Sequence, residues 1–264
     1  MGTGYSKLFS IGITAFVVGA VLFFFVFSGP RKSHGAVSSA SAPPRALGEE
    51  NHELHKFSLT GFDDHGKKFW NLEGETAKVD PSQSVYLDDH VTLRLKDDTV
   101  VRTDHLEWLP EKGRLRTPAP VYVDHPDIQI KGMGAFGKLN ENFIQINRQI
   151  EVRIHQTTQL VCQGPMKIFY KENRISFYRK VKVTDERGVL TADRMEVFLD
   201  SKEKKVRQIT AFGRVVVERG SDVTRAEKAT YLVATGVVRL EGNPEIILNQ
   251  TTAGGEDFNI GGSS

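Results

Sequence analysis

From about residue 54 onward, the chain alternates apolar and polar residues in short runs, as in VTLRL at 91–95. A period of two is typical of a β-strand with one buried face. A second strand-like segment precedes each run, and turn-forming stretches such as DPS at 80–82 and KEN at 171–173 separate the strands. The pattern therefore predicts a succession of β-hairpins, and no sustained helical period interrupts it.

The hairpins repeat at a near-constant spacing. When the first strand of each of six units is aligned on one inward-facing position, the spacings are 29, 29, 31, 29 and 34 residues. A period of this size indicates stacked structural repeats, each of which contacts only its neighbours. The aligned positions are Ala77, Leu106, Ala135, Met166, Met195 and Ala229.

The repeat predicts an all-β fold, and the size of its unit limits the architecture. A propeller blade needs four strands, whereas each unit supplies about two. A small closed barrel ends after about eight strands, whereas roughly twelve to fourteen follow one another here. An elongated stack of hairpins that forms two facing sheets fits best. Such a stack needs few apolar residues, in agreement with a hydrophobic share of 39% that includes the dense segment 8–27.

The residues expected to face inward form one apolar stripe of small, flexible and aromatic side chains. This alternation is compatible with a core filled by its own side chains. It is equally compatible with an apolar groove that admits a lipid, in which Met and Ala leave adaptable space. The predicted lipid-groove residues are Ala77, Val79, Leu93, Leu106, Trp108, Val121, Val123, Ala135, Val152, Met166, Ile168, Val183, Met195, Val197, Val217 and Tyr231.

An apolar segment at 8–27 predicts a transmembrane anchor. It holds 16 apolar residues in 20, and no charged residue lies between Lys7 and Arg31. As a helix, about 20 such residues span a hydrocarbon core of roughly 30 Å. The run is longer than the usual apolar region of a cleaved signal peptide, and the flanking charges do not fix its orientation. Residues 28–50, rich in Ser, Ala and Pro, are expected to form a flexible linker, and residues 251–264 a disordered tail.

Charge is nearly balanced over the chain but differs between its halves. The formal net charge is +2, with −3 over residues 51–155 and +3 over residues 156–264. The near-neutral total argues against a nucleic-acid partner. Basic residues concentrate between 167 and 182, where they either contact lipid phosphates at the rim of a groove or are solvated flanks of hairpins. The possible lipid-phosphate rim consists of Lys171, Arg174, Arg179 and Lys180.

The sequence offers no set of residues suited to catalysis, to a metal or to a cofactor. His52 and His55 lie three residues apart without an evident third ligand, and the lone Cys162 excludes a disulfide within the chain and a multi-cysteine zinc site. Nucleophile and phosphate-loop motifs are absent. The inward positions are almost wholly apolar, which disfavours a carbohydrate-active enzyme with clustered carboxylates. We therefore expect no enzyme activity, no metal and no cofactor.

The order of these features resembles the periplasmic lipopolysaccharide-transport proteins. Residues 54–155, with FSLTGFDDHGKKFWNLEGETAKVD followed by VYLDDHVTLRL, look like the LptC type. Residues 160–250, with GVLTADRMEVFLD, ITAFGRVVVERG and TRAEKATYLVATGVVRLEGNPEIIL, look like the LptA/OstA type, and this second match is the more specific. The predicted domains are an LptC-like β-jellyroll at 51–155 and a continuous LptA/OstA-like β-jellyroll at 156–250.

The resemblance implies a twisted, V-shaped β-jellyroll that is open along one side. It also implies a single-pass inner-membrane protein whose C-terminal part lies in the periplasm. Such a protein carries lipopolysaccharide, acyl chains in the groove, from an inner-membrane ABC transporter toward the outer membrane. Family members join head to tail by edge-strand pairing, so the implied partners include the transporter subunits and an LptA-type protein or the periplasmic domain of the outer-membrane translocon. The predicted edge-strand docking residues are Phe57, Leu59, Ile246, Ile247 and Leu248.

A second class of function is compatible with the same sequence. An anchored β-repeat scaffold or adaptor of the cell envelope would show the same anchor and the same alternation but would carry no lipid. The geometry of the interior distinguishes the two, because an open groove favours transport and a dry, fully packed interior favours a scaffold.

Overall fold

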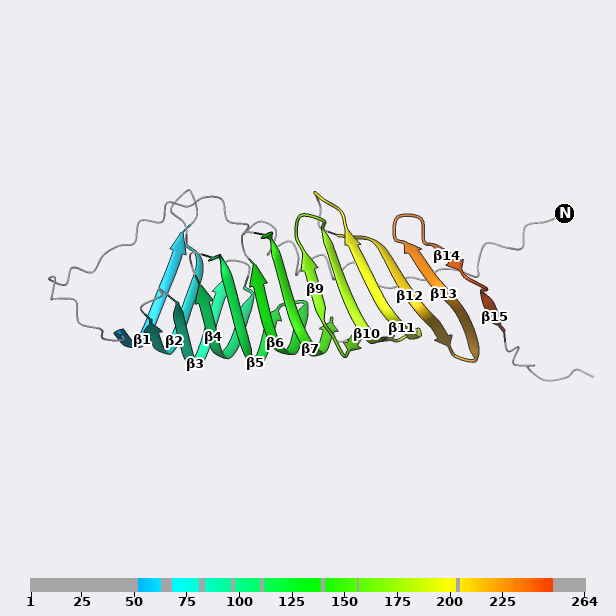
Figure 1. Ribbon diagram of the computed structural model, residues 1–264. Helices are drawn as coiled ribbons and strands as arrows, with labels where there is room; N and C mark the ends of the chain where they lie inside the picture. The colour runs from blue at the N-terminus through cyan, green and yellow to red at the C-terminus, as the bar shows by residue number, and fades with distance from the viewer. Residues whose placement is uncertain are drawn as a thin grey trace, which may run out of the picture.

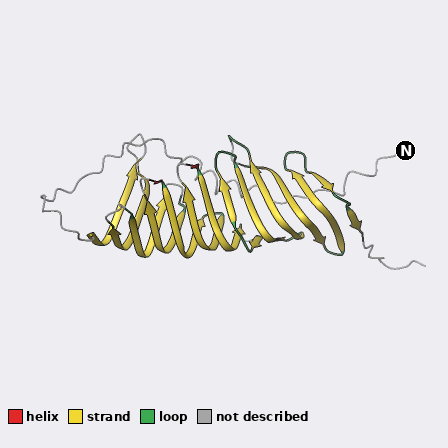
Figure 2. Ribbon diagram, in the orientation of Figure 1, coloured by secondary structure: helices red, strands yellow, loops and turns green. Residues whose placement is uncertain are grey.

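The structure, a computed structural model, describes residues 52–62, 68–80, 84–95, 98–109, 112–138, 141–155, 157–202 and 205–248. Nearly all of this part is β-strand (Figure 2). The predicted anchor at 8–27, linker at 28–50 and tail at 251–264 lie outside the described residues. Within the described part, none of the secondary structure is a helix with the length and apolar character needed to cross a membrane.

The described strands form one antiparallel sheet in which neighbours in space are mostly neighbours in sequence. Figure 1 shows them as an elongated row from β1 to β15. The strands are β1 (His52–Phe62), β2 (Lys68–Val79), β3 (Val85–Leu95), β4 (Val100–Leu109), β5 (Arg114–His125), β6 (Ile128–Lys138), β7 (Phe143–Ile154), β8 (Thr158–Cys162), β9 (Met166–Phe169), β10 (Arg174–Asp185), β11 (Gly188–Leu199), β12 (Val206–Arg219), β13 (Asp222–Leu232), β14 (Val237–Glu241) and β15 (Glu245–Ile247).

Two positions in the row are each occupied by two short strands. β8 and β9 both lie between β7 and β10, and β14 and β15 both pair with β13. In the described part of the sheet, β1 is therefore one edge, and β14 and β15 together form the other edge.

The long strands are bent near their middles. The pairing register shifts between Glu73 and Thr76 in β2, between Tyr178 and Val181 in β10, and at corresponding points in other strands. A β-bulge adds a residue to one strand and bends it, and several of these positions have positive φ, including Arg179 at 64° and Gly213 at 73°. The shifts fold the sheet along one line, called the bend below.

The bend divides the sheet into two arms. The first arm contains β9 and β14, and the second arm contains β8 and β15. The largest buried cluster joins second-arm residues such as Val152 and Leu160 to first-arm residues such as Met166 and Val197, so the arms face each other. The two facing sheets predicted from the sequence are thus the two arms of one folded sheet.

The register confirms the alignment of the repeat. Across β2, β3 and β4, Ala77 pairs with Leu87 and Leu87 pairs with Leu106, which begins a row of residues on one face. The same row then continues through Thr117, Ala135, Ile146, Met166, Phe177, Met195, Ala211, Ala229 and Leu240. All six aligned positions therefore lie on one face of the first arm.

Candidate functional site

The predicted groove residues all lie on the inner face of the folded sheet. Nine of them are buried, namely Ala77, Val121, Val123, Val152, Met166, Ile168, Met195, Val197 and Tyr231. Six are half-buried, namely Leu93, Leu106, Trp108, Ala135, Val183 and Val217. Val79, close to the β1 edge, is 36% exposed. The structure thus brings these residues together on one surface.

One inner row runs the whole length of the second arm. It begins at Leu59 in β1 and ends at Ile246 in β15, so it joins the two edges of the sheet. Its members are Leu59, Leu72, Leu93, Val101, Val123, Ile130, Val152, Leu160, Val183, Leu190, Val217, Thr224 and Ile246. Apart from Thr224 the row is apolar, because the period-two pattern keeps the same side of every strand inward.

The space between the arms is filled in the centre of the sheet. Met166 and Phe177 are each 2% exposed, and Met195 is 5% exposed. Burial there also shifts two titrating groups: desolvation raises the pKa of the Cys162 thiol to about 11 and raises the pKa of the Tyr170 phenol well above its ordinary value. The centre of the interior is therefore a packed, water-poor core.

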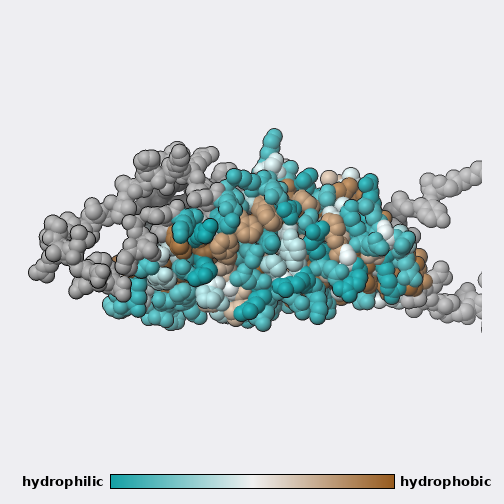
Figure 3. All heavy atoms as spheres, viewed as in Figure 1, coloured by the Kyte–Doolittle hydropathy of each residue, from teal (hydrophilic) through white to brown (hydrophobic). Residues whose placement is uncertain are grey.

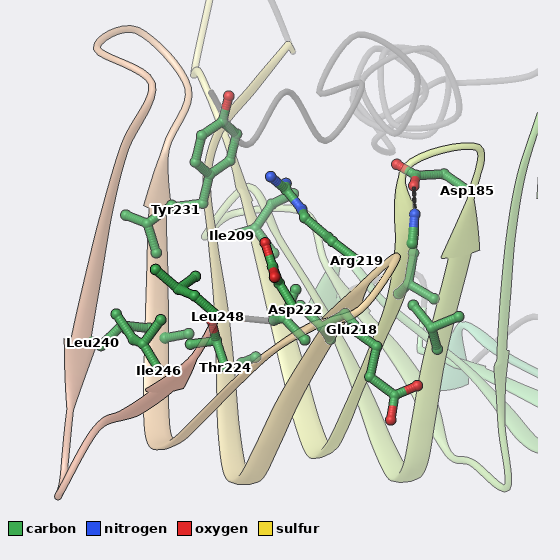
Figure 4. Close-up of a pocket in the computed structure, with 18 residues that line it drawn as sticks. Asp185, Ile209, Glu218, Arg219, Asp222, Thr224, Tyr231, Leu240, Ile246 and Leu248 are labelled. Carbon is green, nitrogen blue, oxygen red and sulfur yellow. Dashed lines mark hydrogen bonds between the residues drawn. The ribbon is translucent and has the colours of Figure 1, made fainter. Parts of the chain in front are cut away.

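The filling ends toward the C-terminal edge. After Met195, the same first-arm row continues with Ala211 and Ala229, whose side chains are much smaller. A hollow of about 150 Å³ lies at this end (Figure 4). Its apolar wall includes Ile209, Tyr231, Leu240, Ile246 and Leu248. The hollow thus lies where the small side chains of Ala211 and Ala229 follow Met195 in this row.

Charged residues from the second-arm hairpins also line this hollow, beside its apolar wall. They are Asp185, Glu218, Arg219 and Asp222. The Asp185 carboxylate accepts a hydrogen bond from the Gly188 backbone N–H at 3.1 Å, which holds the β10–β11 turn closed. The hollow therefore combines an apolar wall with a charged margin.

The predicted phosphate-rim residues lie in two places. Lys171 lies in the turn between β9 and β10, and Arg174 opens β10 beside it. Arg179 and Lys180 lie on the bend, both exposed and both with positive φ, and Arg179 Nε donates a hydrogen bond to the Gly164 carbonyl. The four cations thus do not form one cluster, because Lys171 and Arg174 lie at the hairpin end of the first arm and Arg179 and Lys180 lie on the bend.

The predicted docking residues lie at both edges of the sheet. Leu59, Ile246 and Leu248 are 43%, 47% and 56% exposed, and Ile247 is half-buried. Phe57 is 9% exposed and belongs to a buried cluster, because its ring lies against Gly74. The side chain of Phe57 is therefore part of the core, whereas the other four border free backbone.

Three features of the site were missed from the sequence. β14 shares the C-terminal edge with β15, although VVRLE at 237–241 shows only a short alternation. Phe177 and Ala211 lie in the same inner row as the aligned positions. The sequence could have identified Phe177 and Ala211, because each lies on the strand that follows an aligned position. The hairpin turn between the two strands sets their register and so shows which residue pairs with the aligned position. In the described ranges, no three His, Cys, Asp or Glu side chains are grouped so that they could hold a metal ion.

Comparisons with known proteins match the two parts of the chain to two families. Residues 45–155 match the family described as lipopolysaccharide-assembly, LptC-related. Residues 165–261 match the family described as LptA/(LptD N-terminal domain) LPS transport protein. The chain is therefore an all-β protein of the lipopolysaccharide-transport class. More particularly, it joins an LptC-type N-terminal half to an LptA-type C-terminal half.

Among solved structures, the chain is similar to LptH, described as the LptA homologous periplasmic component of the conserved lipopolysaccharide transport device from Pseudomonas aeruginosa. The match has 8% sequence identity and a TM-score of 0.19, and it covers 69% of this chain and 95% of that chain. The comparison with curated proteins gave no match.

Proposed function

We propose that the chain is a membrane-anchored component of a periplasmic bridge that carries lipopolysaccharide from an inner-membrane ABC transporter toward the outer membrane. The observation that carries the proposal is the inner row from Leu59 to Ile246, which connects the two edges of the sheet. Acyl chains need continuous apolar surface to leave one site and enter the next. A row of this kind supplies that surface over the whole length of the described sheet.

The acyl chains would occupy the space between the arms. The hollow beside Tyr231 and Leu240 already offers room at the C-terminal end. In the centre, Phe177 and Met195 fill the interior, so passage there requires the arms to part. Methionine suits such a path because its unbranched side chain repacks easily.

Both edges of the sheet would dock partners by strand pairing. β1 and the pair β14 and β15 each present unpaired backbone groups, which extend a partner's sheet when another strand is added. β1 would face the inner-membrane transporter, and β15 would face an LptA-type protein or the translocon. The predicted anchor at 8–27 would hold the chain at the membrane, and a flexible linker of 23 residues would span roughly 26 Å.

One observation favours a second candidate function. The packed centre around Phe177 is what an anchored scaffold without lipid cargo would show. In the transport function, lipid lies against the inner face. In the scaffold function, only the protein's own side chains lie there.

The test places a photo-crosslinking residue on each face of the same strand in the full-length chain. Tyr231 lines the hollow, whereas Arg225, in the second-arm part of the same strand, points outward and is exposed. In cells that make lipopolysaccharide, transport predicts lipopolysaccharide adducts at position 231 and few or none at position 225. A scaffold predicts no adducts at position 231 and at a second inner position, Met195, and that result would contradict the proposal.

A further inference from the structure

The outer face of the first arm carries a row that contains three aromatic rings, one cation and one amide before it ends in two apolar residues. The row lies next to the first-arm hairpin turns, on the side opposite the bend. Its members are Phe143, Phe169, Arg174, Phe198, Gln208, Leu232 and Val237. Figure 3 shows brown, apolar side chains lying among teal ones on the face that carries β9 and β14.

The rings and cations of this face are in direct contact. The Phe143 and Phe169 ring centroids lie 5.2 Å apart, and Arg174 Cζ lies 4.2 Å from the Phe169 centroid. Arg207 Cζ lies 5.7 Å from the Phe198 centroid. Such contacts hold a guanidinium plane against a ring and keep both in place. The face is therefore preorganised and half-buried.

Two further ring–cation pairs lie closer to the bend on the same face. Lys167 Nζ lies 5.3 Å from the Tyr178 ring centroid, and Arg194 Cζ lies 4.2 Å from the Phe212 centroid. The structure thus shows four ring–cation pairs on β9 to β12 of one outer face. Among the described residues, the outer face of the second arm carries one such pair, Lys131 with Tyr122 at 5.7 Å.

Charge on the first-arm face is only partly neutralised. Arg174 pairs with Glu172 and with Glu196, and Arg194 lies 3.9 Å from Glu196. Within the described residues, no carboxylate pairs with Lys167 or Arg207, and Arg207 is exposed. Lys167 and Arg207 are therefore available to bind an anionic ligand. If the cations served only to cover the rings, cations without a carboxylate partner would not be needed.

We propose that this face binds the anionic, phosphorylated saccharide of the transported lipid. Rings offer flat apolar surfaces against which the C–H faces of sugars pack, and Arg and Lys bind phosphate or carboxylate groups between the sugars. The inference rests on the proposed function: with acyl chains between the arms, the saccharide leaves past the hairpin turns and meets the first-arm row directly. A free phosphorylated oligosaccharide has the same chemistry and would bind to the same place.

The test uses the full-length chain in detergent and a deacylated, phosphorylated core oligosaccharide as the probe. Binding is followed by saturation-transfer NMR. Phe169→Leu and Phe198→Leu remove the rings but keep apolar bulk, and Arg207→Gln removes one unpaired cation at an exposed position. The three changes together are expected to lower the affinity at least fivefold. The matched control, Tyr122→Leu with Lys131→Gln on the second arm, is expected to leave the affinity within twofold.

Further measurements show which part of the probe gives the binding signal and whether lipid transport is affected. Dephosphorylated oligosaccharide is expected to bind at least fivefold more weakly, and lipopolysaccharide crosslinking from position 231 is expected to persist in the triple variant. Equal binding of the triple variant and the unaltered chain would overturn the proposal, and so would equal binding of the dephosphorylated probe. A triple variant that loses pairing with a protein partner but keeps oligosaccharide binding would also overturn it. None of these results would change the crosslink at position 231, so failure of this inference is distinguishable from failure of transport.

Discussion

Met195 in β11 pairs with Ala211 in β12, and on the first arm the lining of the hollow begins at this step, because Ala211 lines the hollow and Met195 does not. The two residues occupy the same inner row, so the backbone spacing is unchanged and only the side-chain volume differs. Toward the centre, Met166 and Phe177 keep the arms apart by filling the space between them. Toward the C-terminal edge, Ala211 and Ala229 leave the space open.

Filling the hollow should block cargo without unfolding the chain. Ala229 lines the hollow and is 9% exposed, so Ala229→Leu places three additional carbon atoms in that space. We expect lipopolysaccharide crosslinking from a probe at Val238, which pairs with Tyr231 and lines the hollow, to fall at least threefold. Ala234→Leu, in the exposed turn between β13 and β14, is the matched control and should leave the adducts unchanged. Equal adduct yields in the two variants would show that the hollow is not occupied by cargo.

Emptying the centre should cost stability. Phe177 is 2% exposed within the largest buried cluster, and truncation of a buried phenylalanine to alanine typically costs about 3–5 kcal/mol. Phe177→Ala should lower the free energy of unfolding by about that amount, measured by denaturant titration. Lys182→Ala, at an exposed outward position of the same strand, should change it by about 0.5 kcal/mol or less. A loss under about 1 kcal/mol for Phe177→Ala would show that the centre is not tightly packed.

Much of this fold could be predicted because a period-two pattern specifies which face of a strand is inward. Alignment of the repeated strand pattern predicts that Ala77, Met166 and Met195 lie in one row, and the register confirms it. Whether the interior is filled or hollow could not be predicted. Alternation shows that a face is apolar, but it does not give the distance between that face and the opposite arm. Likewise, Arg174 and Arg179 are near in sequence, but Arg174 lies at the hairpin end of the first-arm part of β10 and Arg179 lies at its other end, on the bend.

The buried thiol should be a sensitive reporter of the closed state. Desolvation raises the pKa of Cys162 to about 11, so at pH 8 roughly one thiol in a thousand is the reactive thiolate. Because a raised thiol pKa favours the neutral form, reactivity should stay low from neutral pH until the pH approaches 11. We expect slow reaction with a chromogenic disulfide reagent at pH 8 and fast reaction after denaturation. Fast reaction of the native chain would contradict a packed centre.

Pairing at the C-terminal edge should depend on β15. Ile247 pairs with Val223 in β13, and proline there removes a backbone N–H from an edge strand. Ile247→Pro is expected to abolish crosslinks between β15 of one protein and the first strand of an LptA-type partner. Ala234→Pro, in the neighbouring turn, should leave the crosslinks intact. If docking survives Ile247→Pro, β15 is not the docking strand.

The central claim is that lipid occupies the interior of this protein. The most direct measurement is mass spectrometry of the full-length chain isolated in mild detergent from cells that make lipopolysaccharide. The account predicts co-isolated lipopolysaccharide in near-stoichiometric amounts, reduced at least threefold by Ala229→Leu and unchanged by Ala234→Leu. Isolation of a folded chain free of lipopolysaccharide, or lipopolysaccharide that is insensitive to Ala229→Leu, would contradict it.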